Sequence, residues 1–136
     1  MWYNIYSMTE NNKTKILIVE DEEILLRVFK EELNEEGFDV VTATNGEEAV
    51  TLAKTKKPGL ILLDIILPRK NGFEVLEILK ASPETKNIPV IMISVQGNDE
   101  NITKALSLGA SDYIVKSQHS MVEIINKIKG FLYGRN

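Results

Sequence analysis

The sequence contains no cysteine and only one histidine among its 136 residues. The lack of cysteine excludes disulfide bonds and thiolate metal sites, and a single histidine excludes a metal site built from several imidazoles. No apolar run is long enough to cross a bilayer. The segment from Met1 to Thr9 also lacks the basic and apolar regions of a signal peptide. We therefore expect a cytoplasmic protein that makes no membrane contact.

Basic residues are too few and too dispersed to predict unaided nucleic-acid binding. Lys and Arg number 16 against 20 Asp and Glu, which gives a net charge of −4, and no basic cluster stands out. The chain is 43% hydrophobic and 26% charged, as is ordinary for a globular domain. Its length suffices for one domain with a real core.

Short apolar runs alternate with segments of helical periodicity along most of the chain. Strands are predicted at residues 16–19, 38–42, 60–63, 89–93 and 113–115, and helices at 24–33, 47–54, 73–79, 102–108 and 121–132. Such alternation predicts an α/β fold, with a doubly wound, five-stranded parallel sheet, helices on both faces and right-handed crossovers. The apolar residues at helical spacing in these helices include Ile24, Leu106 and Val122, and Ala49, Val50 and Ala53 are expected to face inward.

Residues 1–14 do not share this pattern and are predicted to form a flexible N-terminal tail. The tail is polar with scattered aromatic residues, among them Trp2. Met8 lies just before the patterned sequence and is an alternative start of the protein. The folded domain is predicted to occupy residues 15–134.

Acidic residues close two of the predicted strands. Glu20 and Asp21 follow the first strand, and Asp64 follows the third. Because the carboxyl ends of parallel strands meet at one edge, where open α/β folds bind ligands, the three carboxylates are expected to cluster. Ser94 and Lys116 end the fourth and fifth strands at the same edge.

Three close carboxylates repel one another and need a counter-ion, for which oxygen ligands favour Mg²⁺, with Mn²⁺ as a substitute. Such a site suits phosphoryl transfer, which requires positioning and charge neutralisation. Asp64 would be the nucleophile that forms an acyl phosphate, while Ser94 and Lys116 would bind the other phosphoryl oxygens. Taken singly, each residue has an ordinary explanation: Asp21 or Glu22 as a helix cap, the others as loop residues. Their joint placement at the strand ends favours the functional interpretation.

Four segments resemble the receiver domain of two-component response regulators, at residues 16–22, 62–74, 91–94 and 108–116. The chain as a whole resembles a regulator of the chemotaxis type, which consists of a single receiver domain. The resemblance extends from Lys15 to about Leu132. It implies a three-layer, flavodoxin-like fold with strand order 2-1-3-4-5. It also implies that a sensor histidine kinase or a histidine phosphotransfer protein phosphorylates Asp64. Such a domain is a signalling switch rather than an enzyme, and catalyses only its own Mg²⁺-dependent phosphotransfer and autodephosphorylation.

The resemblance also assigns roles to individual residues. Glu20 and Asp21 match the metal-binding acidic pair, and the backbone carbonyl of Ile66 matches the third protein ligand. Ser94 matches the switch hydroxyl, and Tyr113 matches the aromatic residue that swings inward with it. The ordinary alternative for Tyr113 is that its ring only packs against neighbouring residues of the strand.

The sequence departs from the family pattern at two positions. Ser117 stands where the family has a proline in a cis peptide, and because a cis bond without proline costs about 2.5–4 kcal/mol, we predict a trans peptide and a shifted loop. Val95 replaces a small residue and either narrows access to Asp64 or packs as a strand residue. Gln96 and Ile66 are predicted to flank an attacking water. His119 is predicted to lie in the loop before the last helix rather than to act as a relay histidine.

The family resemblance places the output surface on the fourth helix, fifth strand and fifth helix, at residues 101–108, 111–115 and 121–133. A second copy of the chain, forming a homodimer, or a downstream protein would bind there.

The sequence leaves three alternative functions. The first is an aspartyl phosphatase or mutase, but such enzymes commonly have a second acid where Ile66 stands. The second is a flavin-binding protein of the same topology, but the acidic run at 20–23 would repel the phosphate of the flavin. A phosphorylation-independent, receiver-like interaction domain is the strongest alternative, given Val95 and Ser117.

Overall fold

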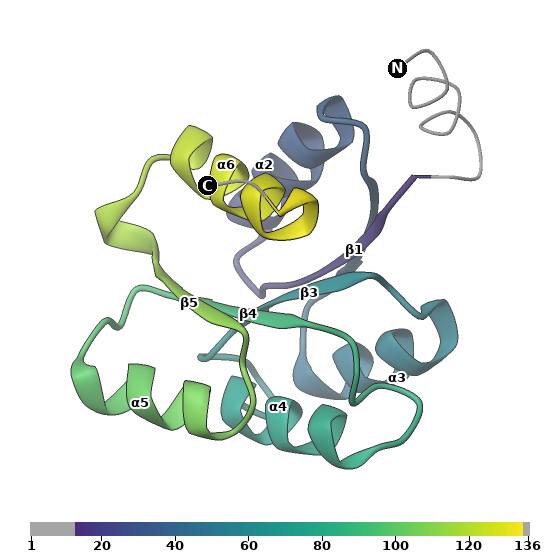
Figure 1. Ribbon diagram of the computed structural model, residues 1–136, viewed down its shortest axis with the longest axis vertical. Helices are drawn as coiled ribbons and strands as arrows, with labels where there is room; N and C mark the ends of the chain where they lie inside the picture. Colours follow the sequence, from purple (N-terminus) through teal and green to yellow (C-terminus); the bar gives the residue numbers. More distant parts are fainter. Residues whose placement is uncertain (1–12, 135–136) are drawn as a thin grey trace.

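The sheet of the computed structural model, which describes residues 13–134, has five parallel strands in the order β2-β1-β3-β4-β5 (Figure 1). This confirms the predicted flavodoxin-like topology. Most of the predicted tail, including Trp2 and Met8, lies outside the described residues. The strands are β1 (Lys15–Val19), β2 (Asp39–Ala43), β3 (Leu60–Asp64), β4 (Val90–Ser94) and β5 (Asp112–Val115).

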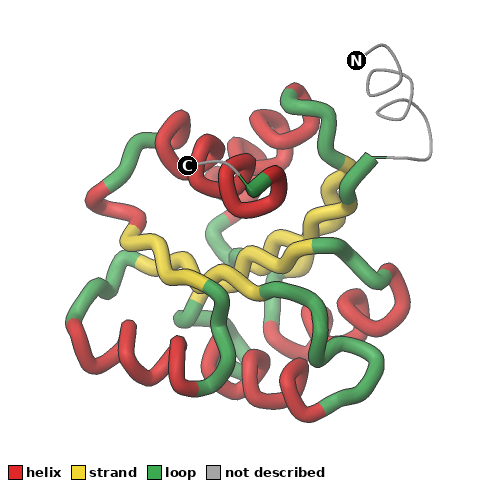
Figure 2. Tube along the Cα trace, viewed as in Figure 1, coloured by secondary structure: helices red, strands yellow, loops and turns green. Residues whose placement is uncertain are grey.

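Helices cover both faces of this sheet, so that the fold has three layers (Figure 2). One face carries α2 and α6, and the other carries α3, α4 and α5 (Figure 1). The helices are α2 (Glu23–Glu35), α3 (Gly46–Lys56), α4 (Gly72–Ala81), α5 (Asp99–Ser107) and α6 (Met121–Tyr133), with a 3₁₀ turn, η2, at Lys116–Gln118. Within residues 13–134, none of these helices is both long enough and apolar enough to span a membrane.

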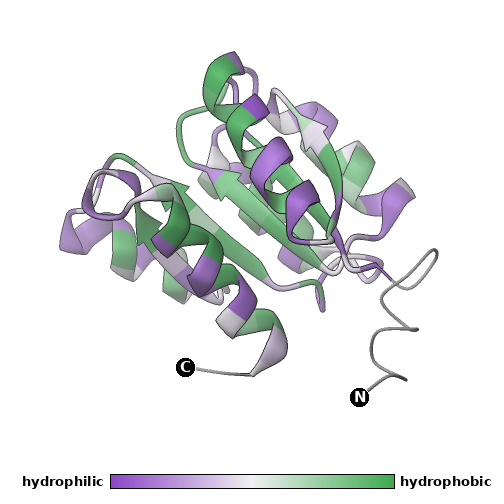
Figure 3. Cartoon of the chain, turned by 90° about the horizontal axis from the view of Figure 1, so that it is seen from above, coloured by the Kyte–Doolittle hydropathy of each residue, from purple (hydrophilic) through white to green (hydrophobic). Residues whose placement is uncertain are grey.

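The core consists of two hydrophobic layers separated by the sheet. Alternate residues of each strand face opposite layers: Ile61 and Leu63 pack toward α3, α4 and α5, whereas Leu60 and Leu62 pack toward α2 and α6. Because both faces are covered, β3 and β4 are buried along their whole length and read as continuous apolar runs. Figure 3 shows the hydrophobic sheet between helices whose outer surfaces are hydrophilic.

The ends of the helices are set by local capping residues. Asn71 and Ser120 each form a capping box with the glutamate three residues on, which starts α4 and α6. Gly37 and Gly109 follow α2 and α5 with φ angles of 95° and 108°, a region that suits glycine. These residues lie where the sequence predicted the helix boundaries.

Three of the apolar residues at helical spacing are exposed rather than buried. Ile24 and Val122 are 69% and 66% exposed, because each is the second residue of its helix and points away from the core, while Leu25 and Met121 beside them pack against it. Leu106 is 47% exposed, since α5 is short and turns Ala105 toward the sheet instead. The helix α6 buries Ile124 in addition to the predicted Ile125 and Ile128.

Candidate functional site

Three carboxylates meet where β1 and β3 end. These strands pair in parallel, with Val19 opposite Leu63, so Glu20 and Asp21 leave the sheet beside Asp64. One carboxylate oxygen of each acid lies within 4.8 Å of the others. Glu20 and Asp64 are buried, at 2% and 6% exposure, whereas Asp21 is exposed. The structure therefore brings together the acidic cluster that the sequence predicted.

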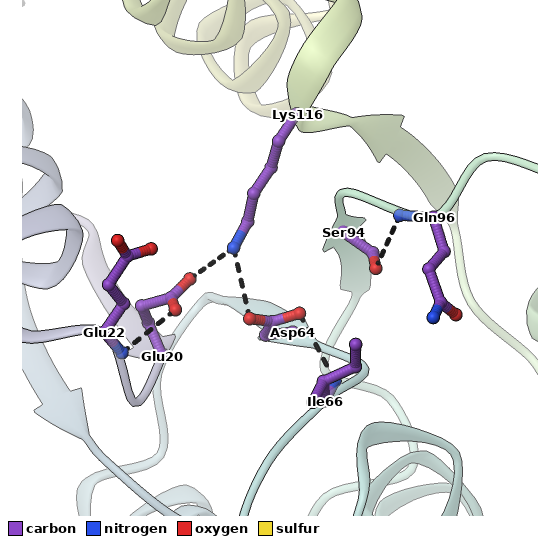
Figure 4. Close-up of polar contacts among 7 residues, drawn as sticks. All are labelled: Glu20, Glu22, Asp64, Ile66, Ser94, Gln96 and Lys116. Carbon is purple, nitrogen blue, oxygen red and sulfur yellow. Dashed lines mark hydrogen bonds and ion pairs between the residues drawn. The ribbon is translucent and has the colours of Figure 1, made fainter.

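Lys116 reaches this cluster from the end of β5. Its Nζ donates to Glu20 Oε1 at 2.6 Å and to Asp64 Oδ2 at 3.1 Å (Figure 4). Among residues 13–134 there is no cis peptide bond, so the predicted trans Lys116–Ser117 peptide is confirmed. The loop continues as the 3₁₀ turn η2, and the replacement of proline by Ser117 leaves the lysine within reach of both carboxylates.

The electrostatics of the cluster are dominated by burial and by this shared ammonium. Burial raises the pKa of Glu20 above its usual range, and the charge of Asp64 adds to the rise, while the hydrogen bond from Lys116 opposes it. For Lys116, burial acts to lower the pKa, but the bond to Glu20 and the charge of Asp64 outweigh it and raise the pKa. The lysine therefore stays charged, and one ammonium faces three acids.

Two backbone N–H groups orient the buried acids. Glu20 Oε2 accepts from the N–H of Glu22 at 3.1 Å, and Asp64 Oδ1 accepts from the N–H of Ile66 at 3.4 Å (Figure 4). Glu22 occupies the N-cap position of α2 without a side-chain capping bond. Glu22 is thus the N-cap residue by position, but its side chain does not cap the helix, and Asp21 does not occupy the cap position.

A hydroxyl lies on the strand next to Asp64. Ser94 ends β4, which pairs with β3, and it is completely buried. Its Oγ accepts from the N–H of Gln96 at 3.2 Å. Tyr113 on β5 is half-buried, and its hydroxyl donates to the carbonyl oxygen of Gln96. Burial raises the pKa of Tyr113, which keeps the phenol protonated as a donor.

Two apolar side chains in the loops around Asp64 are exposed. Val95 is 61% exposed and Ile66 is 54% exposed. The alternative that Val95 packs as a strand residue is wrong, because β4 ends one residue earlier. His119 lies in the loop between η2 and α6, as predicted, with its Nδ1 3.7 Å from Glu123 Oε1.

The sequence did not reveal the role of Asn101. Its Nδ2 donates to Gln96 Oε1 at 3.0 Å, so the Gln96 side chain is engaged with α5. The sequence singled out Gln96 only by its position, two residues after Ser94, as a residue that flanks an attacking water. No local signal marks the contact with Asn101, because it depends on how the loop between β4 and α5 folds.

Comparison with known proteins agrees with this geometry. The family model for the response regulator receiver domain matches residues 16–129. The phosphate regulon transcriptional regulatory protein PhoB of Rhizobium meliloti is 37% identical over 118 residues, which cover 87% of this chain and 52% of that protein. The chain therefore spans about half the length of the curated relatives it matches.

Solved structures extend the comparison to the fold. The phosphorylated cyanobacterial phytochrome response regulator RcpA is 34% identical, with a TM-score of 0.75 that covers 88% of this chain and 93% of that one. The Mn²⁺-bound response regulator Rcp1 is 28% identical, with a TM-score of 0.76 over 88% and 94%. Because the family match includes the acidic cluster and most of the sheet, the chain belongs to the response regulator receiver domain family.

Proposed function

We propose that this receiver domain is a phosphorylation-controlled signalling switch in which Asp64 accepts a phosphoryl group from a sensor histidine kinase or a histidine phosphotransfer protein. The observation that carries the proposal is the Lys116 ammonium, 2.6 Å from Glu20 and 3.1 Å from Asp64, beside the exposed carboxylate of Asp21. A buried carboxylate next to a fixed cation can approach an anionic phosphoryl group with reduced repulsion.

In the proposed transfer, an Asp64 oxygen bonds to phosphorus while the phosphorus–nitrogen bond of a phosphohistidine breaks, and the released imidazole takes up a proton from water. Lys116 neutralises charge on the incoming phosphoryl oxygens. Ser94 Oγ already accepts from the Gln96 N–H, so its own hydrogen is available to donate to a phosphoryl oxygen. Attack of water on the acyl phosphate would later restore the carboxylate.

The donor set at the acidic cluster fits a hard divalent cation. Glu20, Asp21 and Asp64 would hold Mg²⁺, or Mn²⁺ in its place, together with the backbone carbonyl of Ile66. When bound, the ion supplies positive charge that offsets the repulsion between Asp64 and the phosphoryl oxygens. The proposed chemistry is confined to self-catalysed transfer and autodephosphorylation of the domain, without turnover of a released substrate.

The proposed readout is a change on the surface formed by α5, β5 and α6. A phosphoryl group adds about −1.5 to −2 charges, enough to bias an element that has two arrangements. A shallow cavity of about 600 Å³ lies on this surface, lined by Asp112, His119 and Phe131 among others. A second copy or a downstream protein would bind there. We place the domain in the cytoplasm, and its net charge of −4 gives no support for direct contact with nucleic acid.

Mass spectrometry of the intact protein tests the proposal. Incubation with acetyl phosphate and Mg²⁺ should add the mass of one phosphoryl group to the wild type and to Asp39→Asn, a control at an exposed acid on the opposite edge of the sheet. The gain should be absent in Asp64→Asn and in the presence of a chelator. A wild type that neither gains mass nor binds beryllofluoride would instead be a phosphorylation-independent interaction domain.

A further inference from the structure

Gln96 is one residue that makes hydrogen bonds to three different elements. Its N–H donates to Ser94 Oγ at the end of β4 at 3.2 Å (Figure 4). Its carbonyl oxygen accepts from the hydroxyl of Tyr113 on β5, and its side-chain Oε1 accepts from Asn101 Nδ2 in α5 at 3.0 Å. The residue beside the site hydroxyl is thus bonded directly to two elements of the proposed output surface.

The loop that carries Gln96 contacts its neighbours on both sides. A Cβ placed on Gly97 would lie 2.7 Å from the Val115 side chain, so the loop is packed directly against β5. At the other end, the Asn101 N–H donates at 2.8 Å to Oδ1 of Asn98, the residue that caps α5. Asn101 is therefore fixed to the start of α5, and only Gly97 and Asn98 separate Gln96 from that helix along the chain.

We propose that Gln96 is a positioning residue whose side-chain bond to Asn101 transmits the state of the Ser94 hydroxyl to α5. The proposal rests on the proposed phosphorylation of Asp64. When the Ser94 side chain shifts its Oγ toward a phosphoryl oxygen in order to donate to it, the Gln96 N–H that bonds to this Oγ has to follow, or the bond breaks. Gln96 then moves, and its side chain pulls on Asn101 and the first turn of α5.

Nuclear magnetic resonance of the ¹⁵N-labelled protein tests this coupling. Mg²⁺ with beryllofluoride serves as the probe, and the chemical-shift changes of the α5 amides are measured against those of Asp64 and Ile66. In Gln96→Ala and in Asn101→Ala, the changes along α5 should fall about twofold or more, while those at Asp64 and Ile66 persist. The matched control is Gln118→Ala at an exposed glutamine of η2, which should behave as the wild type.

The conservative variant Gln96→Glu separates signal transmission from a merely structural role. A glutamate keeps an oxygen that accepts from Asn101 Nδ2, so it should restore the α5 changes to the wild-type size. Unchanged α5 shifts in Gln96→Ala would overturn the proposal. Changes at Asp64 without any along α5 in the wild type would overturn it as well and leave the proposed phosphorylation standing. A wild type with no change at Asp64 would overturn both.

Discussion

The site depends, at the scale of single residues, on one ammonium held between two buried acids. Glu20 and Asp64 are almost inaccessible to water, and Lys116 contacts both. Removing one partner from a buried ion pair leaves the other charge buried and unpaired. The loss of stability is then larger than the net stability that the intact pair contributes. The stability of the metal-free protein should therefore be sensitive to this lysine.

We expect Lys116→Met, which keeps the length of the side chain, to lower the free energy of unfolding by about 1–3 kcal/mol in the absence of divalent cations. Urea denaturation measures the loss. The control is Lys129→Met, which removes a partly exposed ion pair with Glu36 at 2.6 Å and should cost under about 1 kcal/mol. Equal losses in the two variants would contradict the prediction.

Tyr113 gives a second prediction at this scale, because its hydroxyl donates to the Gln96 carbonyl and burial raises its pKa above the usual 10.0. A raised folded-state pKa means that its contribution to stability is complete below about pH 10 and is lost as the pH rises through the folded-state pKa. Tyr113→Phe should be less stable than the wild type by about 0.5–1.5 kcal/mol at neutral pH. Chemical denaturation should show the difference shrinking above about pH 10; a constant difference would refute it.

At the scale of the structural element, Gly46 and Gly72 pack closely against the loop that follows β3. A Cβ on Gly72 would lie 2.3 Å from the carbonyl oxygen of Asp64, and one on Gly46 would lie 2.3 Å from that of Lys70. Both obstacles are backbone atoms, which cannot move aside without shifting the loop. The first turn of α4 therefore helps to fix the backbone of Asp64 and Ile65, and that of α3 helps to fix the backbone of Lys70.

Gly72→Ala should lower the free energy of unfolding by about 1–3 kcal/mol, because the added methyl group forces the loop away from α4. The same shift should weaken Mg²⁺ binding at Asp64, as measured by calorimetric titration. Gly59→Ala is the matched control, since its Cβ would meet only the side chain of Thr14, at 3.3 Å, and Lys15 O, at 3.7 Å. Mg²⁺ binding in Gly72→Ala as tight as in this control would argue against the role of the loop.

At the scale of the whole molecule, the fold should respond to metal as one cooperative unit. The sheet connects both hydrophobic layers, and the acids of the site extend β1 and β3 at its centre. A ligand that binds only the folded state adds stability by mass action, about 2.7 kcal/mol at a hundredfold excess over Kd. Metal bound at one edge should therefore raise the melting temperature of the entire domain.

We expect Mg²⁺ to raise the melting temperature in a concentration-dependent manner, and a chelator to reverse the effect. Asp21→Asn should largely abolish the increase at little cost to the metal-free protein, because Asp21 is exposed and its removal lessens repulsion in the cluster. Asp39→Asn serves again as the control. Differential scanning calorimetry measures the melting temperatures of the wild type and both variants with and without Mg²⁺. A full Mg²⁺ response in Asp21→Asn would exclude that residue as a ligand.

Most of the fold was predictable because its signals are local. Glycine and asparagine mark the ends of helices, and a strand buried on both faces is apolar up to its last residue here, so β3 and β4 are visible as apolar runs. Helical spacing did not predict the exposure of Ile24 and Val122, because it identifies an apolar face of a helix but not which residues of the first turn contact the core.

The sequence by itself determined the order of the elements, the doubly wound topology and the edge at which Glu20, Asp64, Ser94 and Lys116 gather. It did so because the sheet is parallel, and each strand delivers its last residue to the same side. Only the tertiary structure decided that Lys116 contacts two acids, that Asp21 stays exposed, and that Gln96 joins Ser94 to Asn101. Those contacts depend on loop conformation and on side chains distant in sequence, which no local pattern encodes.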